Sequence, residues 1–116
     1  LFGGRVDEGE EPLRAAKREL LEEAGYASDD WEIIRACEPY SKMEWTVYIY
    51  VARNSVKIAE QNLDAGEKIK ILPVDYNKFL EIVDTEDFRD KDFYNYIVKV
   101  KQDEKGLREF KKKLFG

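Results

Sequence analysis

Residues 3–26 read GGRVDEGEEPLRAAKRELLEEAGY, a stretch in which a glycine-containing loop leads into a segment dense in acidic side chains. Pro12 suits the first turn of a helix, because the N–H that proline lacks would have no intrahelical partner there. Gly25 suits the position just past the helix, where a left-handed backbone costs glycine little. The sequence therefore predicts a helix from about Glu11 to Ala24.

Two faces of this expected helix carry different residue types. At about 100° per residue, Glu19, Glu22 and Glu23 fall within one arc of roughly 100°. A second arc groups apolar side chains that we expect to face the core: Leu13, Ala16, Leu20 and Ala24. Clustered carboxylates repel one another, so a hard divalent cation with oxygen ligands is the natural occupant of the acidic face.

The stretch resembles the signature of the Nudix hydrolase family, G-x5-E-x7-R-E-U-x-E-E-x-G-U, in which U is a bulky apolar residue. The positions that match are Gly4, Glu10, Arg18, Glu19, Leu20, Glu22, Glu23, Gly25 and Tyr26. All seven fixed residues are present, and the one departure is Tyr26, where the family usually has an aliphatic residue. A chance match is improbable, since glycine alone makes up only about 7% of an average protein.

The resemblance implies metal-assisted hydrolysis of a phosphoanhydride, with Mg²⁺ as the cofactor and Mn²⁺ as a substitute. It assigns Glu22 and Glu23 as the principal metal ligands and Glu19 as a ligand or the base. It also implies that the backbone carbonyl near Gly3 is a further oxygen donor. These residues are the candidate metal site.

The remaining signature residues are expected to shape or support that site. Gly4, Glu10 and Gly25 are structural by resemblance, and Arg18 would pair with Glu10 or orient a carboxylate of the helix. Arg18 is counted with the catalytic group. Its i,i+4 relation to Glu22 permits contact with that carboxylate, although Arg18 lies on the flank of the acidic face. The alternative to a metal site is an ordinary charged helix face exposed to solvent, which the loop glycines and the spacing of the signature disfavour.

The resemblance also implies a fold class: α/β, as a Nudix-like α/β/α sandwich with a mixed sheet. We expect residues 1–116 to form a single Nudix-like domain. Nudix proteins usually have several strands before the signature, so we expect a chain whose N-terminal strands are missing, or a domain completed by another chain. A homodimer is therefore a hypothesis.

Residue patterns predict further elements after the first helix. Residues 44–52, EWTVYIYVA, give the strongest strand signal because they are rich in aromatic and β-branched residues. Ile33 and Ile34 are expected on opposite faces of an earlier strand. The other expected strands are Trp31–Cys37, a short extended piece at Val56–Ala59 and an edge strand at Lys68–Val74. Three further helices are expected: Tyr76–Val83, Asp90–Lys101 and Glu104–Leu114. Asp75 can cap the first of these three.

Later residues suggest a substrate class. The stretch LDAGEKIKILPVDYNKFLEIV is similar to the glutamate-bearing loop, strand and helix of ADP-ribose and nucleotide-sugar pyrophosphatases, which makes Glu67 a candidate catalytic residue; surface charge is the alternative. Tyr40, Trp45 and Tyr48 could stack on a nucleobase or simply pack in the core. Lys68 and Lys70 are most simply an exposed strand face.

We accordingly expect hydrolysis of a nucleoside diphosphate linked to another moiety, most of all ADP-ribose or a nucleotide sugar. Tyr40 also suggests a dinucleoside polyphosphate hydrolase, and a (d)NTP pyrophosphohydrolase is a further alternative. The alternative of another class is a catalytically silent Nudix domain that binds a nucleotide or a protein.

Composition bounds these expectations. The net charge of −5 does not indicate a nucleic-acid partner, and no apolar run approaches the roughly 20 residues that span a bilayer. The single cysteine, Cys37, cannot form an internal disulfide, which fits a cytoplasmic protein. Because the chain has no histidine, acid–base chemistry falls to carboxylates, Lys, Tyr or water. A small nucleotide is the expected partner.

Overall fold

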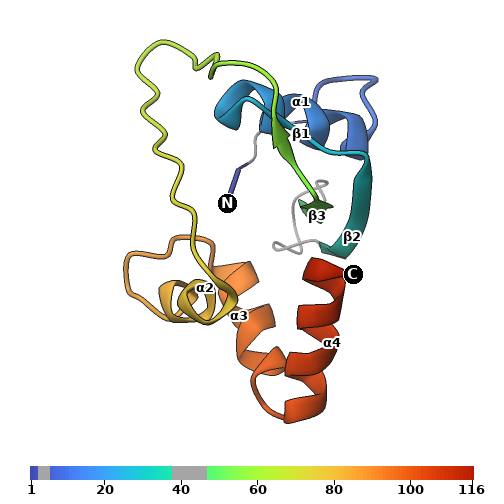
Figure 1. The fold of residues 1–116 in the computed structure, drawn as a ribbon, viewed down its shortest axis with the longest axis vertical. Helices are drawn as coiled ribbons and strands as arrows, with labels where there is room; N and C mark the ends of the chain where they lie inside the picture. Colours follow the sequence, from blue (N-terminus) through green and yellow to red (C-terminus); the bar gives the residue numbers. More distant parts are fainter. Residues whose placement is uncertain (3–5, 38–46) are drawn as a thin grey trace. The chain divides into compact units, whose positions relative to one another are not determined.

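The computed structural model describes residues 1–2, 6–37 and 47–116, and these form two compact units, residues 1–71 and residues 72–116. Among these described residues, unit 1 holds one helix and four strands, and unit 2 holds three helices. Figure 1 shows their order along the chain. The α/β class is confirmed, whereas the expectation of a single domain stays a prediction.

Helix α1 spans Pro12–Ala24, as expected from its two ends. Glu11 precedes it with an extended backbone, and Gly25 ends it in the left-handed conformation with φ 75°. The Gly25 N–H donates to Leu21 O at 2.8 Å, which satisfies one of the carbonyls that a helix end leaves without a partner.

The core face of α1 differs in part from the expected one. Ala24 is buried, as predicted, but Ala15 is also buried, although it was not placed on the apolar arc. The other three members of that arc are only half-buried: Leu13, Ala16 and Leu20. Helix α1 packs beside strands β1 and β3, and its fully buried apolar side chains are the small ones of Ala15 and Ala24.

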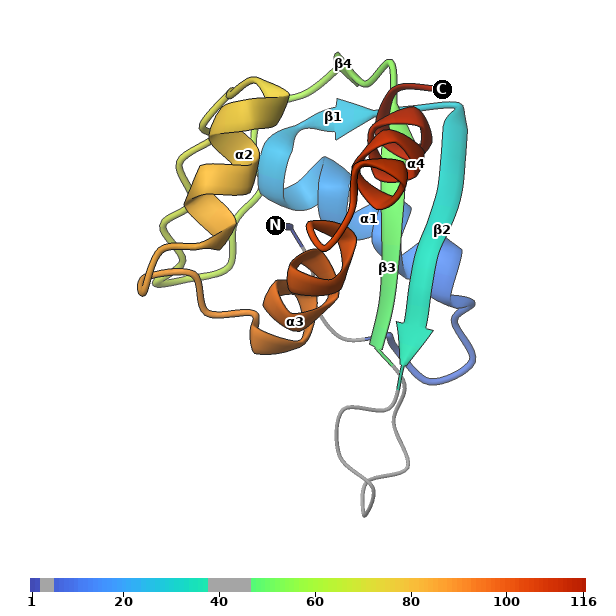
Figure 2. The same cartoon turned by 90° about the horizontal axis from the view of Figure 1, so that it is seen from below.

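Strands β2 (Asp30–Cys37) and β3 (Val47–Arg53) form an antiparallel pair that lies side by side in Figure 2. The register shifts between Ile33 and Arg35, so Ile34 lies at a bulge. The predicted strand 31–37 is confirmed, as is the described part of the predicted strand 44–52; residues 44–46 lie outside the described residues. Ile33 is exposed and Ile34 is half-buried, and the expectation that they lie on opposite faces of the strand stays a prediction.

A second antiparallel pair joins β1 (Tyr26–Ala27) to β4 (Val56–Lys57), next to the end of α1. It confirms the short extended piece that the sequence predicted after residue 55. Both strand pairs within the described part of the chain are antiparallel, so the parallel pairing of a mixed sheet is not among them.

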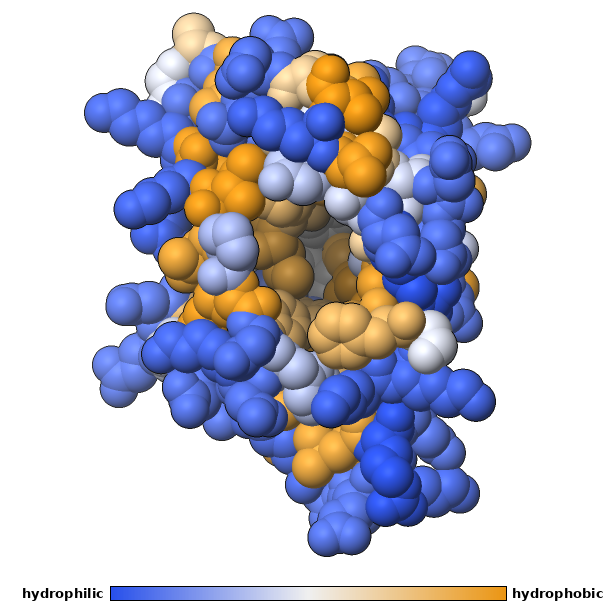
Figure 3. Space-filling view, in the orientation of Figure 1, coloured by the Kyte–Doolittle hydropathy of each residue, from blue (hydrophilic) through white to orange (hydrophobic). Residues whose placement is uncertain are grey.

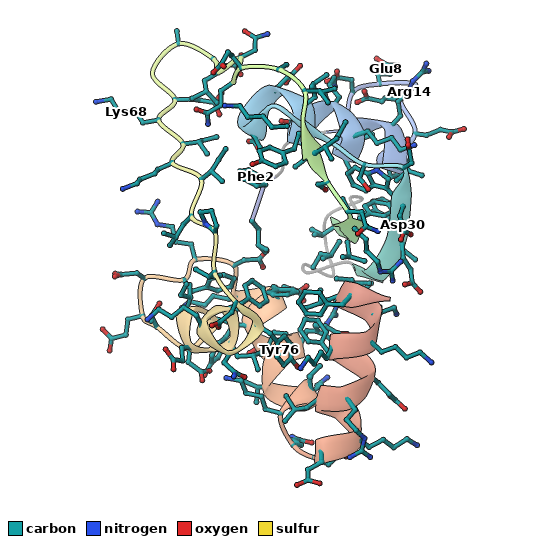
Figure 4. All side chains as sticks on the ribbon, viewed as in Figure 1. Phe2, Glu8, Arg14, Asp30, Lys68 and Tyr76 are labelled. Carbon is teal, nitrogen blue, oxygen red and sulfur yellow. The ribbon has the colours of Figure 1, made fainter. Side chains whose placement is uncertain are left out.

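The predicted edge strand Lys68–Val74 is wrong: these residues run without strand pairing. Alternating Lys and Ile residues favour an extended chain, but a strand also needs a neighbouring backbone to bond to. Here the carbonyl of Ile69 accepts its hydrogen bond from the Gln61 side chain instead of from a strand. Lys68 points away from this segment in Figure 4.

Unit 2 consists of α2 (Tyr76–Val83), α3 (Lys91–Val100) and α4 (Glu104–Phe115), which confirm the three predicted helices. Each begins at an aspartate whose side chain accepts a hydrogen bond from the first turn: Asp75, Asp90 and Asp103. The buried core of the unit comprises Val83, Phe93, Ile97, Val100 and Phe110. Exposed charged side chains line α4, and Figure 3 shows this end of unit 2 as mainly hydrophilic. None of the described helices is long and apolar enough to cross a bilayer.

Candidate functional site

The guanidinium of Arg18 contacts carboxylates of both α1 and the loop before it. Its Nε donates to Glu10 Oε2 at 3.0 Å and its Nη2 to Glu10 Oε1 at 3.1 Å. Its Nη1 donates to Glu19 Oε1 at 3.1 Å and to Glu22 Oε2 at 3.4 Å, and Asp7 Oδ2 lies 3.6 Å from Nη2. The sequence offered pairing with Glu10 or orientation of a helix carboxylate, and Arg18 does both.

The two-point contact with Arg18 gives Glu10 a structural role. Hydrogen bonding from Arg18, and then from the backbone N–H of Asp7, lowers the pKa of Glu10 below its ordinary value of 4.5. The same contact, through the hydrogen bond to Glu10, raises the pKa of Arg18. Because the Asp7 N–H also donates to Glu10 Oε1 at 3.1 Å, this carboxylate ties the loop that precedes α1 to the helix.

The pKa of Glu19 is shifted in the opposite direction from that of Glu10. Burial raises the pKa of Glu19 most, the Arg18 charge lowers it, and the negative charges of Glu22 and Glu67 raise it further. Its side chain is 15% exposed, against 40% for Glu22. An anion that is partly buried among other anions is stabilised by an added cation.

Glu23 is set apart from Glu22 by its surroundings. Glu23 is 7% exposed and lies next to the buried Ala24, on the side of α1 that faces the rest of unit 1. Its backbone carbonyl accepts a hydrogen bond from Gln61 Nε2 at 2.7 Å. The two glutamates that the signature treats as a pair are therefore one buried and one accessible.

Glu67 belongs to a turn in the segment that follows β4. The Asp64 N–H donates to Glu67 Oε1 at 2.7 Å, and the Glu67 N–H donates to Asp64 O at 3.0 Å. Gly66 makes this turn with φ 87°. Glu67 is exposed, and its charge is close enough to Glu19 to help raise the pKa of that carboxyl.

The match to known families agrees with this geometry. The model of the NUDIX domain matches residues 1–97, which is most of the chain. The chain belongs to the Nudix family. No curated protein matches it significantly.

Membership of the Nudix family makes a hydrolase of phosphoanhydrides the general class of this protein, and Nudix hydrolases generally use a divalent metal. Among residues 1–2, 6–37 and 47–116, no three Asp, Glu or Cys side chains are arranged as a ready-made metal cage. The donors nevertheless suit a hard cation, because carboxylates of Glu19 and Glu22 reach a common positive group, Nη1 of Arg18. The described residues thus fit the metal if these carboxylates turn from Arg18 toward it.

Several expected site residues of this Nudix domain lie outside the described residues: Gly3, Gly4, Tyr40 and Trp45. The roles of Gly3 as a carbonyl donor and of Gly4 as a structural glycine therefore stay predictions. The same holds for the stacking of Tyr40 and Trp45 on a nucleobase. Tyr48 lies in β3 with 40% of its surface exposed, so it is not a core residue. Lys68 and Lys70 are exposed, as expected.

Sequence reasoning missed Gln61. Its side chain bonds two backbone carbonyls that are far apart in the sequence, those of Glu23 and Ile69. A glutamine in a polar loop carries no periodic or motif signal, so only the position of its partners reveals the contact.

Proposed function

We propose that this Nudix domain hydrolyses the diphosphate of a nucleoside diphosphate that is linked to another moiety, with ADP-ribose or a nucleotide sugar as the substrate. The observation that carries the proposal is the acidic face of α1, on which Glu19 and Glu22 both contact Arg18 while the charge of Glu67 reaches Glu19. Glu67 sits in the loop that resembles those of ADP-ribose and nucleotide-sugar pyrophosphatases, which supports this substrate class.

In this proposal, some residues of the site position others, and a second group binds the cation and accepts a proton. Glu10 holds Arg18, and Arg18 in turn holds Glu19 and Glu22 on the same side of the helix. The accessible carboxylate of Glu22 and the raised pKa of Glu19 make them the groups that bind a cation and accept a proton, respectively. Glu22 and Glu23 would hold Mg²⁺, and Glu19 would be the base.

Mg²⁺, when bound, neutralises diphosphate charge and lowers the pKa of an attacking water. Around that chemistry, Glu19 accepts a proton from the nucleophile, which a carboxylate with a raised pKa does more readily than an ordinary one. Glu67 would supply a further carboxylate near Glu19, since its charge helps to raise the pKa of Glu19.

The test is a hydrolysis screen of the purified chain with Mg²⁺ over ADP-ribose, nucleotide sugars, dinucleoside polyphosphates and nucleoside triphosphates, with products separated by chromatography. We expect a nucleoside monophosphate and the phosphorylated second moiety from ADP-ribose or a nucleotide sugar, and no products in chelator. Turnover confined to the other two classes would contradict the substrate assignment. Calorimetric binding without any product would favour a silent binding domain.

A further inference from the structure

The segment that follows β4 crosses the carboxyl end of α1 and is fixed there by its backbone. The N–H groups of Ile58 and Ala59 donate to Gly25 O at 2.8 and 3.1 Å, and the N–H of Asn62 donates to Glu22 O at 2.7 Å. The last carbonyls of a helix have no intrahelical partner, so this segment supplies one for Glu22.

Gln61 supplies the partner of the next helix carbonyl from its side chain. Its Nε2 donates to Glu23 O at 2.7 Å and to Ile69 O at 3.0 Å. A side-chain amide nitrogen carries two hydrogens, and both are used here. One amide group therefore joins the end of α1 to Ile69 and closes the loop of residues 62–68 at its base.

That closed loop contains the turn of Glu67. The turn is held internally by the two hydrogen bonds between Asp64 and Glu67, but these bonds do not connect it to α1. The Gln61 amide makes that connection on the Ile69 side, and the Asn62 N–H makes it on the other side. The position of Glu67 relative to the acidic face thus depends on both ends of the loop.

We propose that Gln61 is a positioning residue whose side-chain amide fixes loop 62–68 to the carbonyl end of α1 and so holds Glu67 beside the acidic face. Its consequence for catalysis rests on the proposed function. Freed from Gln61, the loop gains conformations in which Glu67 is turned away, and the fraction of molecules with Glu67 in place falls.

Two substitutions remove the contact in different ways. Gln61→Met keeps the length of the side chain and removes both donors without adding charge, whereas Gln61→Glu replaces the donors by oxygens that repel the two carbonyls. Asn62→Asp is the matched control, because it makes the same amide-to-carboxylate change at the next residue. The Asn62 side chain is exposed, and Asn62 contacts α1 through its backbone N–H, which the substitution keeps.

Amide hydrogen exchange tests the clamp without any metal or substrate. We expect the Glu67 N–H, which donates to Asp64 O, to exchange about tenfold faster in both Gln61 variants than in the wild type or in Asn62→Asp. The Ala15 N–H inside α1 should exchange at the wild-type rate in all of them. Unchanged exchange at Glu67, or equal acceleration at Ala15, would overturn the clamp.

Kinetics test whether the clamp acts through Glu67. Gln61→Met should lower kcat about tenfold with a smaller change in KM, and it should have no further effect in a Glu67→Gln background, because the group that it positions is then already lost. Additive losses in the double variant would overturn the positioning role. If the wild type hydrolyses none of the phosphoanhydrides, the proposed function and the catalytic role both fail, and hydrogen exchange still decides whether Gln61 holds the loop.

Discussion

Arg18 binds Glu10 at both carboxylate oxygens, with Nε 3.0 Å from Oε2 and Nη2 3.1 Å from Oε1. The guanidinium has five N–H donors in a fixed planar arrangement, so it can hold one carboxylate at two points and still offer Nη1 to others. Here Nη1 contacts Glu19 and Glu22. The ion pair between loop and helix is thus also the support of the acidic face.

Glu10→Gln should weaken this support in a way that depends on pH. The pKa of Glu10 is lowered in the folded protein, so its contribution to stability is present above its ordinary pKa of 4.5 and is lost as the pH falls through the lowered folded value. We expect Glu10→Gln to lower Tm at pH 7 and to differ less from the wild type below pH 4.5. Thermal unfolding between pH 4 and pH 7 measures this difference in Tm, and Glu8→Gln, in the same loop, is the control. A Tm difference that does not change with pH would contradict the stabilising role of ionised Glu10.

Glu19→Gln should separate stability from activity. Burial raises the pKa of Glu19 in the folded protein, so its ionised form opposes folding above that pKa, and the opposition disappears as the pH falls and the carboxyl becomes protonated. In chelator at pH 7 the variant should therefore unfold at the wild-type Tm or higher, with a smaller advantage near pH 4. With Mg²⁺ present, its hydrolysis should be strongly reduced relative to the wild type. A lower Tm at pH 7 would show that the contact with Arg18 outweighs burial.

Glu22→Gln should lower Mg²⁺-dependent hydrolysis on the order of a hundredfold or more, since even residues that only support metal ligands cost about 10- to 100-fold when mutated. Its side chain is 40% exposed and lies 3.4 Å from Arg18, so the loss of stability should stay within about 0.5 kcal/mol. Glu81→Gln is a matched control, because Glu81 is an exposed helical glutamate whose ion pair with Lys78 is also 3.4 Å long. Unchanged turnover in Glu22→Gln would exclude Glu22 as a metal ligand.

Gly25→Ala should destabilise unit 1 through two separate effects. The left-handed backbone costs a residue with a Cβ about 1–2 kcal/mol, and the new Cβ would lie 2.0 Å from Ala59 O. Gly9→Ala isolates the first effect, because Gly9 has nearly the same φ, 78°, and no atom within 4 Å of the added Cβ. Chemical denaturation should show a clearly larger loss in the free energy of unfolding for Gly25→Ala than for Gly9→Ala. Equal losses would show that the backbone at Ala59 moves away from the new Cβ at little cost.

Ile97→Ala tests whether the two units unfold as one domain. Ile97 is fully buried in unit 2, so its truncation should cost about 2–5 kcal/mol. Both tryptophans of the chain, Trp31 and Trp45, belong to unit 1. If residues 1–116 form a single cooperative domain, the midpoint measured by tryptophan fluorescence should fall in Ile97→Ala. An unchanged midpoint would mean that the units unfold separately.

The elements that the sequence predicted well are those with local signals at their ends. Pro12 and Gly25 bound α1, and Asp75 marks the start of α2, because these preferences depend on the few residues around them. The alternation of Lys and Ile and the position of Pro73 predict an edge strand at 68–74. These residues form no strand, because strand formation depends on a partner from elsewhere in the chain.

The sequence by itself determined the family, helix α1 and the set of glutamates on its acidic face, because side-chain direction along a helix follows from spacing alone. Only the tertiary structure decided that Glu23 is buried while Glu22 is accessible, that Arg18 holds Glu10 and two helix carboxylates together, and that Gln61 ties the Glu67 loop to the end of α1. The physical reason is that burial and loop anchoring depend on segments that meet only after folding, and no local spacing encodes which carbonyl a distant side chain will reach.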